Sequence, residues 1–424
     1  MSFKITGLGA CGEVGRSSFL LDVGDKILLD RGIKLTPEET EYPLHVQTQL
    51  DAAIISHAHL DHSGDLPHLF TKNKPIVYLT PPTLDLAEML WHDSLKIAGI
   101  EGIDAKFSKA DIKRTRRFSF PIGYRTNLRI TEKISLEFFD AGHIVGSSMA
   151  KLNFDGKSLL YTGDFKVEET RLLRKADLKT GKVDYLIIEG TYGSTSHPKR
   201  QKIEKEFVEA CIRTVERNGV AIVPAFAVGR SHELIDVLSE YKVDAPVYID
   251  GMAQKAAALT MRYPQYLKDP KALKKALEKA IWIRKDSQRK RAIEEPCIII
   301  TTAGMCEGGP VMNYIKNLYN DENSSIFLTG YQVVGTQGRR LIEEGVINID
   351  GKDYRPKCDI RKFDFSAHAG QDELLHAINK WAPQKVFIVH GEPEKIDALK
   401  EKVRSDLGIE AEALAFGKTI KVGE

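Results

Sequence analysis

The segment SHAHLDHSGDLP (residues 56–67) places three histidines and two aspartates directly after the apolar run AAII (52–55). It fits the pattern His-x-His-x-Asp-His at His57, His59, Asp61 and His62. Residues two apart in an extended segment project to the same side, so His57 and His59 can hold one metal ion. A turn after His59 would direct Asp61 and His62 at a second ion. Imidazole and carboxylate ligands suit zinc, and also manganese or iron.

Three more ligand-type residues follow apolar runs and lie beside a glycine. They are His143 in FFDAGHIVGSS, Asp164 in LLYTGDF and His390 in VFIVHGEP. In open α/β folds, sites form at the edge where such strands end. Each residue alone could equally cap a helix or shape a turn. With the first cluster they number seven, which is enough for two metal ions and a bridging carboxylate that together activate water.

The composition of the 424 residues limits the other kinds of site. The net charge of +2 gives no global signal for nucleic acid, so a polyanion site must be local. The five cysteines are scattered without a C-x-x-C pair, so neither disulfides nor a thiolate zinc site is expected. We find no signal peptide pattern and no stretch long enough to cross a membrane. The sequence therefore predicts a soluble, cytoplasmic protein without membrane contact.

The predicted pattern of strands and helices changes along the chain. Short strand-like runs such as FKITGLG, SSFLLDVG and KILLDRG open it, and a helix is expected over 83–99. From about residue 192 to about 345, strand-like runs such as GVAIVPAF alternate with helix-like runs such as SHELIDVLSEY. This alternation predicts a parallel, doubly wound sheet. The C-terminal part adds a helix, a strand and a helix, so the chain reads as one α/β sandwich with a second α/β domain inserted.

These motifs resemble the metallo-β-lactamase fold and its β-CASP nuclease branch. The resemblance also rests on Glu189 in LIIEGTYGS, His368 in FSAHAG, Asp30 in KILLDRG, and the runs VGRSHEL, TAGMCEGGP and GYQVVGTQGRR. It covers nearly the whole chain. It implies an α/β fold: an αββα sandwich formed by residues 1–191 and 352–424, with an inserted doubly wound parallel-sheet domain at 192–351.

The resemblance also implies roles for the ligand residues. One zinc ion would be held by His57, His59 and His143, and the other by Asp61, His62 and His390. Asp164 would bridge them, with Asp30 supporting the ligands from behind, and manganese could replace zinc. His368, oriented by Glu189, would act as general acid on the leaving 3′ oxygen, as phosphodiester hydrolysis needs. This chain departs from the usual pattern at Gly190, where serine is common, and at His232, where glutamine is common; we expect His232 on a helix surface.

Candidate phosphate-binding residues are less specific. GTQGRR places Arg339 and Arg340 after two glycines, and a glycine-rich turn followed by arginine suits phosphate. Ser366 beside His368 and Arg230 in VGRSHEL are further candidates. A solvated arginine pair or a helix cap would explain these residues equally well. The basic runs KRTRRFSF (113–120) and RKDSQRKR (284–291) would give salt-dependent RNA affinity only if they flank the substrate cleft.

The function expected from the resemblance is a two-zinc ribonuclease, with RNA entering between the core and the insert. The chain is most similar to archaeal and bacterial relatives of the nuclease subunit of the cleavage and polyadenylation factor. A homodimer or an RNA-processing, exosome-type assembly would fit this family, and both endonuclease and 5′→3′ exonuclease activities occur in it. Two alternatives stay open here: a thioester or lactam hydrolase on the same core, and a non-catalytic RNA-binding subunit.

Overall fold

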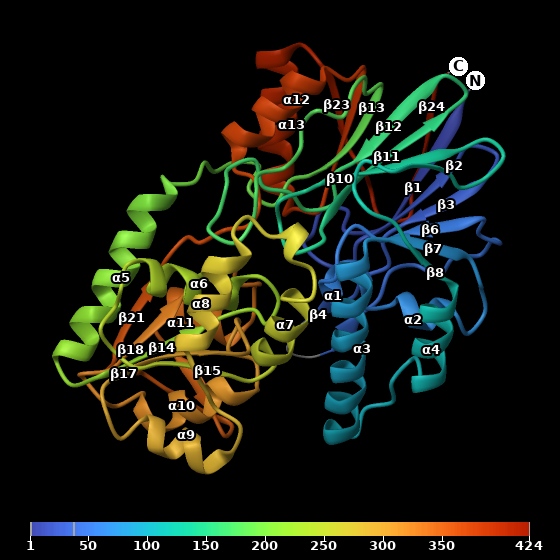
Figure 1. Cartoon of the computed structure of the whole chain (residues 1–424). Helices are drawn as coiled ribbons and strands as arrows, with labels where there is room; N and C mark the ends of the chain where they lie inside the picture. Colours follow the sequence, from blue (N-terminus) through green and yellow to red (C-terminus); the bar gives the residue numbers. More distant parts are fainter. Residues whose placement is uncertain (1, 37–38, 424) are drawn as a thin grey trace. The chain divides into compact units, whose positions relative to one another are not determined.

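The chain forms two compact units in a computed structural model that describes residues 2–36 and 39–423. The sandwich unit comprises Met1–Glu169, Lys175–Ser196 and Ala367–Glu424. The inserted unit comprises Thr170–Arg174 and His197–Ser366. Figure 1 shows the elements of both along the chain. No helix of the described residues is both long and apolar enough to span a membrane.

Two seven-stranded sheets build the sandwich unit. The first, in spatial order, is β24 (Thr419–Val422), β1 (Phe3–Gly9), β2 (Ser18–Asp22), β3 (Lys26–Leu29), β6 (Ala52–Ile54), β7 (Ile76–Leu79) and β8 (Ser119–Pro121). The second is β23 (Glu410–Ala413), β22 (Lys385–Val389), β13 (Tyr185–Glu189), β12 (Lys157–Tyr161), β11 (Ser148–Phe154), β10 (Ser135–Asp140) and β9 (Asn127–Arg129). A small hairpin pairs β4 (Lys34–Leu35) with β5 (Thr40–Glu41).

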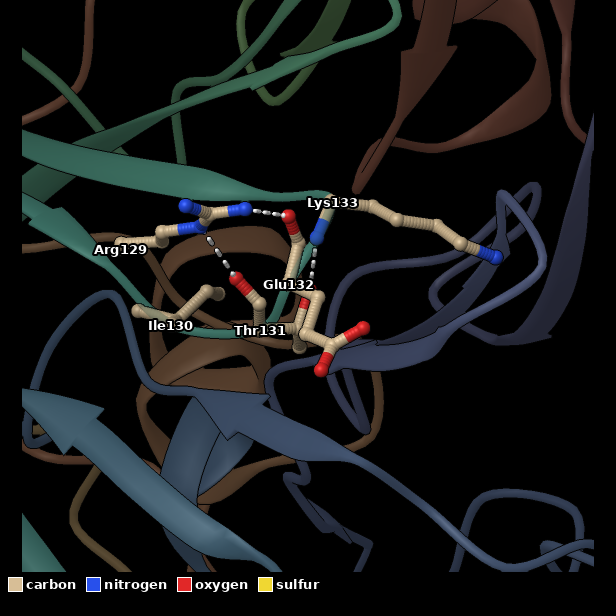
Figure 2. A pocket seen from close by; sticks show the side chains of 5 residues that line it. All are labelled: Arg129, Ile130, Thr131, Glu132 and Lys133. Carbon is tan, nitrogen blue, oxygen red and sulfur yellow. Dashed lines mark hydrogen bonds between the residues drawn. The ribbon is translucent and has the colours of Figure 1, made fainter.

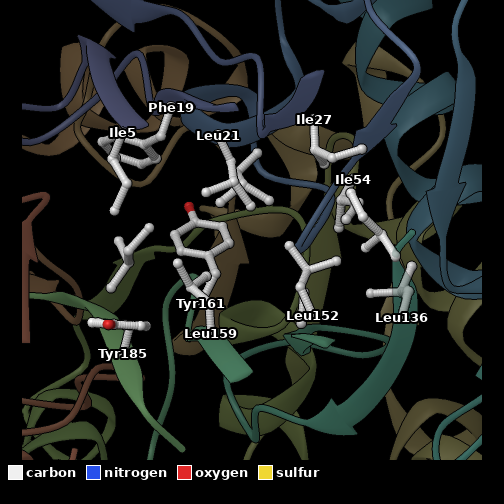
Figure 3. Packing of buried hydrophobic residues seen from close by; sticks show 14 of the residues in the cluster. Ile5, Phe19, Leu21, Ile27, Ile54, Leu136, Leu152, Leu159, Tyr161 and Tyr185 are labelled. Carbon is white, nitrogen blue, oxygen red and sulfur yellow. The ribbon is translucent and has the colours of Figure 1, made fainter. Parts of the chain in front are cut away.

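The inner faces of the two sheets form one apolar core. Ile5, Phe19 and Leu21 of the first sheet face Leu159 and Tyr161 of the second (Figure 3). All five side chains are almost fully buried. Alternation of apolar residues along each strand places one face inward, and burial of that face drives the two sheets together.

Helices cover the outer faces of the sandwich. The first sheet is accompanied by α1 (Leu60–Ser63), α2 (Leu66–Leu69), α3 (Pro81–Glu101) and α4 (Lys109–Phe118). The second sheet is covered by α12 (Gln371–Trp381) and α13 (Pro393–Leu407), which pack on it through Leu374, Ile378 and Leu399. The layers are therefore helix, sheet, sheet and helix, and the predicted fold class is confirmed.

The sheet of the inserted unit is entirely parallel. Its strands, in spatial order, are β16 (Ile281–Trp282), β15 (Val247–Asp250), β17 (Cys297–Thr301), β14 (Val220–Pro224), β18 (Ser325–Leu328) and β21 (Asp359–Lys362). Its helices are α5 (Arg200–Glu216), α6 (Arg230–Glu240), α7 (Ala253–Thr260), η1 (Pro264–Tyr266), α8 (Pro270–Lys279), α9 (Asp286–Ala292), α10 (Pro310–Leu318) and α11 (Gln337–Glu343). A hairpin joins β19 (Ile347–Ile349) to β20 (Lys352–Tyr354). The strand and helix alternation expected from sequence is present.

The compact units differ from the expected ranges at both ends of the insert, which was expected to begin at residue 192, whereas the main segment of the inserted unit begins at His197. The insert was expected to end at residue 351, whereas the inserted unit extends to Ser366. The reason is β21, which pairs in parallel with β18 and forms the sheet edge. The short segment Thr170–Arg174 also joins the inserted unit, because the guanidinium of Arg171 contacts Glu204.

Strand direction determines where ligand-type residues gather in the sandwich unit. Strands β3, β6, β7 and β8 run parallel, as do β12, β13, β22 and β23. Strand β10 runs in the direction of β12, because both are antiparallel to β11. The carboxyl ends of parallel strands meet at one edge, which is where ligands bind in open α/β sheets.

Candidate metal centre

The His-x-His-x-Asp-His segment is fixed by its backbone. It follows β6, turns at His59 and continues into α1. Ser17 N donates to Asp61 O at 2.7 Å, and Arg31 N donates to His62 O at 2.9 Å. A Cβ at Gly32 would lie 1.8 Å from Asp61 O, so only glycine permits this close approach. The loop therefore presents its side chains from a rigid frame.

Seven predicted ligands come together in two groups. Within each group the candidate ligand atoms lie within 4.8 Å of one another. The first group is His57, His59 and His143, and the second is Asp61, His62, Asp164 and His390. These residues follow β6, β10, β12 and β22, as the strand-end argument requires.

Asp164 lies between the two groups. Its Oδ2 is 3.2 Å from His62 Nε2, 3.6 Å from His57 Nε2 and 3.8 Å from His143 Nε2. Its Oδ1 is 3.3 Å from His390 Nδ1. This is the arrangement that a bridging carboxylate needs.

The glycine before Asp164 permits this position. Gly163 has φ +51°, and a Cβ there would lie 2.6 Å from Ser56 Cβ. The loop after β12 can therefore pack directly on the loop after β6, which brings Asp164 to the histidines.

The donor set fits a metal ion. His57 Nε2 and Asp164 Oδ1 are buried, and neither has a hydrogen-bond partner among the described residues. Leaving such atoms unsatisfied in an interior is costly, and most buried polar atoms have partners. Histidine nitrogens and a carboxylate that converge at this spacing match the ligands of zinc. A divalent cation between them would satisfy these atoms.

Polar contacts behind the ligands orient them. Asp30 Oδ2 accepts from His62 Nδ1 at 2.7 Å, from Ser56 Oγ at 2.6 Å and from Tyr161 Oη at 2.6 Å. His62 therefore turns Nε2 toward Asp164. On the other side, His143 Nδ1 donates to Ala367 O at 2.9 Å. Such contacts fix the tautomer and ring orientation of a metal-binding histidine.

The electrostatics hold three of the ligands in the form that binds metal. Burial, with nearby histidines, holds the pKa of His57 and His143 well below the usual value, so both are neutral. Burial alone would raise the pKa of Asp164, but His390 and His62 outweigh it and hold that pKa well below its usual range. Neutral imidazoles and an ionised carboxylate are the ligand forms that a metal requires. The exception is His62: burial lowers its pKa, but Asp164 and Asp61 outweigh burial and raise it, so this histidine must release a proton when a metal ion binds.

His368 and Glu189 form a pair beside this cluster. His368 Nδ1 donates to Glu189 Oε2 at 2.9 Å, and Glu189 Oε1 accepts from Phe165 N at 2.9 Å. Burial lowers the pKa of His368, but Glu189 and Asp164 outweigh burial and raise the pKa to about 9. His368 is therefore protonated at neutral pH. Its ring centroid lies 4.7 Å from that of His143.

Sequence reasoning missed several supporting residues. Thr191 Oγ1 lies 3.2 Å from His390 Nδ1, and Ser56 Oγ lies 3.0 Å from His57 Nδ1. Arg31 Nε and Asp65 Oδ2 form a buried ion pair at 2.7 Å behind the loop. The sequence offers one clue to these four supporting residues: each lies within four positions of a predicted site residue.

The predicted phosphate-binding residues all lie in the inserted unit. Arg339 pairs with Glu343 at 2.6 Å, and Arg340 pairs with Asp353 at 2.6 Å. Arg230 is buried against Glu233, and Ser366 N donates to Asp364 Oδ1 at 3.3 Å. Their roles in phosphate binding stay predictions.

The expectation for His232 is wrong. Its side chain is fully buried on α6, and Nε2 donates to Ala253 O at 3.0 Å. The helix is buried along most of its length, because it packs between the sheet and α8.

A shallow hollow of about 670 Å³ lies over the turn between β9 and β10 (Figure 2). Arg129 Nε donates to Thr131 O at 3.3 Å, and Thr131 Oγ1 accepts from Lys133 N at 3.2 Å. The turn thus satisfies its own polar groups, and none of the lining residues belongs to the ligand cluster.

Three family models match the chain. Residues 20–189 match the "Metallo-beta-lactamase superfamily domain", residues 232–341 the "Beta-Casp domain", and residues 353–414 the "Zn-dependent metallo-hydrolase RNA specificity domain".

Curated relatives match over nearly the whole chain. A protein of Methanocaldococcus jannaschii named "Probable RNase MJ4" is 39% identical over 98% of this chain and 99% of its own length. "RNase aCSPSF2" of Saccharolobus solfataricus is 32% identical over 100% of this chain and 86% of its own length. "Transcription termination factor FttA" of Methanosarcina mazei is 35% identical over 99% of this chain and 71% of its own length.

Proposed function

The chain belongs to the β-CASP family of metallo-β-lactamase-fold ribonucleases, and from that membership we propose that it hydrolyses RNA phosphodiester bonds with two zinc ions. The chain is a metal-dependent hydrolase, and RNA is its substrate. The number and identity of the ions are the proposed part. The observation that carries it is the convergence of six ligand-type side chains around Asp164; five of the seven residues are buried, and His59 and Asp61 are partly exposed.

The two groups would each hold one ion. His57, His59 and His143 suit the first, and Asp61, His62 and His390 suit the second. Asp164 belongs to the second group and also lies near His57 and His143, so it can serve both. Bound ions of this kind supply an acidified water at neutral pH and polarise the phosphoryl oxygens. Zinc is the proposed metal because imidazole nitrogens predominate among the ligands, and manganese is the alternative.

The residues of the chain supply the proton for the leaving group. Hydrolysis forms a bond from water oxygen to phosphorus and breaks the bond from phosphorus to the 3′ oxygen. His368 holds its Nδ1 proton against Glu189 and can give its Nε2 proton to that oxygen. The proton lost by the attacking water balances this transfer, and the products carry a 5′-phosphate and a 3′-hydroxyl.

The supporting contacts keep this arrangement in place. Asp30 holds His62, the carbonyl of Ala367 holds His143, and the amide of Phe165 holds Glu189. Ala367 directly precedes His368, so one short segment positions both a ligand and the proton donor. Arg339 and Arg340 would bind phosphate only if RNA displaces their present carboxylate partners.

The two other candidate functions lack such support. A thioester or lactam hydrolase would need no RNA specificity domain, whereas residues 353–414 match one. A non-catalytic subunit would have no need of a complete ligand set. Cytoplasmic location, homodimer formation and an exosome-type assembly stay predictions.

The test is cleavage of end-labelled RNA carrying either a 5′-monophosphate or a 5′-hydroxyl. We expect zinc-dependent products from RNA and no turnover of a chromogenic thioester or lactam. Laddered internal products would identify an endonuclease, and mononucleotides that depend on the 5′-phosphate would identify a 5′→3′ exonuclease. Thioester or lactam turnover without RNA cleavage would refute the proposal.

A further inference from the structure

Helix α4 carries a concentration of positive charge that the metal centre does not use. Its ten residues, KADIKRTRRF, hold five cations and one carboxylate, a net +4, in a chain whose total is +2. The buried face of the helix is formed by Asp111, Ile112 and Thr115. The cations lie on the remaining surface, and this local excess needs an explanation.

The five cations fall into two classes. Arg114 pairs with Asp111 at 2.8 Å, and Arg116 pairs with Asp85 at 3.0 Å. Lys109, Lys113 and Arg117 are exposed, and none of the three has an ion-pair partner among the residues that the structure describes. We call Lys109, Lys113 and Arg117 the α4 ridge.

The spacing of the α4 ridge aligns its charges. Its members are four residues apart, so they lie on one face of the helix, at steps of about 6 Å along the axis. A row of cations on one face is the local feature that a polyanion needs, since the whole chain is close to neutral.

Helix stability does not account for this row. Lys109 is the first residue of α4, where a cation opposes the helix dipole, whereas Arg117 lies in the last turn, where a cation is favourable. Like charges four residues apart also repel, which affects both neighbouring pairs of the α4 ridge. The two dipole effects offset each other and the repulsion remains, so the row brings the helix no net stability, which favours a role in binding.

The α4 ridge belongs to the same layer of the sandwich unit as the ligand loop. Helix α4 packs on α2 and α3, and α2 directly follows α1, which carries Asp61 and His62 (Figure 1). Trp91 Nε1 of α3 donates to Ser63 O of α1 at 2.9 Å. The position of the α4 ridge is thus fixed relative to the metal centre.

We propose that the α4 ridge binds the sugar–phosphate backbone of the RNA substrate at a site additional to the metal centre. The proposal rests on the proposed function for the identity of the polyanion. Lysine and arginine bind phosphate through charge, and the α4 ridge has no aromatic residue on which a base could stack. The contact is therefore independent of base sequence and sensitive to salt.

The test compares two triple variants of the full chain. The first is Lys109→Gln, Lys113→Gln and Arg117→Gln. The control, Lys202→Gln, Lys274→Gln and Lys402→Gln, removes the same charge from exposed helical lysines that have carboxylate partners four residues on. Binding of fluorescein-labelled 30-nucleotide oligo(U) and oligo(A) is measured by anisotropy in chelator, which prevents cleavage, over a range of salt concentrations.

We expect the first variant to bind both RNAs roughly tenfold or more weakly, with a salt slope smaller by about 2, since each phosphate contact on a single strand contributes about 0.7. The control should match wild type. Unchanged affinity and slope in the first variant, or an equal loss in the control, would overturn the proposal, and an acidic protein surface would then be the partner to examine.

Two further measurements separate possible failures. The wild type could bind RNA more tightly than the first variant and yet cleave no RNA with zinc. That result would refute the proposed function and leave the proposed RNA-binding role of the α4 ridge intact. If the first triple variant does not fold, Lys113→Gln alone should still lower the salt slope by about 0.7, and an unchanged slope would refute the ridge.

Discussion

Asp164 and Asp250 occupy comparable places in the two units but have opposite surroundings. Both are buried and lie at the carboxyl end of a strand, β12 and β15 respectively. Asp250 is saturated by its own chain: it accepts from Arg289 Nε at 2.7 Å, from Tyr314 Oη at 2.8 Å and from Gly251 N at 2.7 Å. Asp164 instead faces several histidines, and its Oδ1 has no hydrogen-bond partner among the described residues.

The difference shows what distinguishes a ligand site from a structural carboxylate. A buried aspartate with a fixed arginine and a tyrosine is neutralised by the fold itself. The positive charge beside Asp164 comes from histidines instead. Unlike an arginine, a histidine can release its proton, so a divalent ion can replace that charge. Position at a strand end is therefore not enough to make an aspartate a metal ligand. The groups that surround the carboxylate determine its role.

The largest expected effect separates these two aspartates. Asp164→Asn should lower the rate of RNA cleavage by more than roughly 10⁴-fold and release metal, because both ligand groups lose their shared carboxylate. Asp250→Asn should retain metal and cleave RNA at a rate near that of wild type. Metal analysis and cleavage kinetics measure both, and an active, metal-loaded Asp164→Asn variant would break the distinction.

His368→Gln should remove the proton donor while leaving metal binding intact. We expect kcat to fall by about 10²–10⁴-fold, because the 3′ oxygen then leaves without a proton donor. The metal content should equal that of the wild type, because Glu189 holds Nδ1 of His368 and the two assigned ligand groups do not include it. His368 also lies within ligand distance of His143 and Asp164, so a loss of metal would instead make it a ligand. A rate within threefold of wild type would remove His368 from the mechanism.

His232 extends the comparison to buried histidines. Burial lowers its pKa to about 4, although it donates to Ala253 O. Between pH 6.5 and pH 4 the unfolded chain binds a proton that the folded chain rejects, so stability falls as the pH falls. The difference in pKa corresponds to about 3 kcal/mol.

The matched variant is His232→Gln, whose amide can donate to the same carbonyl. Both proteins should lose stability between pH 7 and pH 4. The loss of unfolding free energy should be about 3 kcal/mol smaller for the variant than for the wild type. Urea denaturation at each pH measures this, and its metal content should stay unchanged. Parallel pH profiles for the two proteins would refute the assigned burial effect.

The smallest expected effect concerns the stability of the inserted unit. Asp250→Asn should lower the unfolding free energy by about 1–3 kcal/mol, because charge-assisted hydrogen bonds to Arg289 and Tyr314 are weakened. Asp286→Asn changes the exposed partner of the same arginine and should cost less than about 0.5 kcal/mol. Equal losses in the two variants would show that burial of Asp250 carries no special weight.

Sequence reasoning found the parts of the molecule that have local signals. The ligands follow apolar runs and sit beside glycines, as Asp164 does after Gly163, so strand ends could be recognised one at a time. The alternation of strands and helices between β14 and α11 is equally local. Both kinds of pattern were readable without knowledge of distant contacts.

The features that were missed depend on distant contacts. Strand β21 has partly exposed, polar residues, and only its pairing with β18 identifies it as part of the inserted unit. The burial of His232 depends on packing against elements far away in sequence. The contact of Asp30 with Tyr161 joins residues 131 positions apart, which no local pattern could predict.

The central claim is that the Asp164 cluster binds the ions that drive RNA hydrolysis. The most direct measurement strips the protein with a chelator and follows RNA cleavage as zinc is returned in known amounts per chain. We predict no cleavage by the metal-free protein and maximal cleavage at two bound ions per chain. Undiminished cleavage by the metal-free protein would contradict the claim.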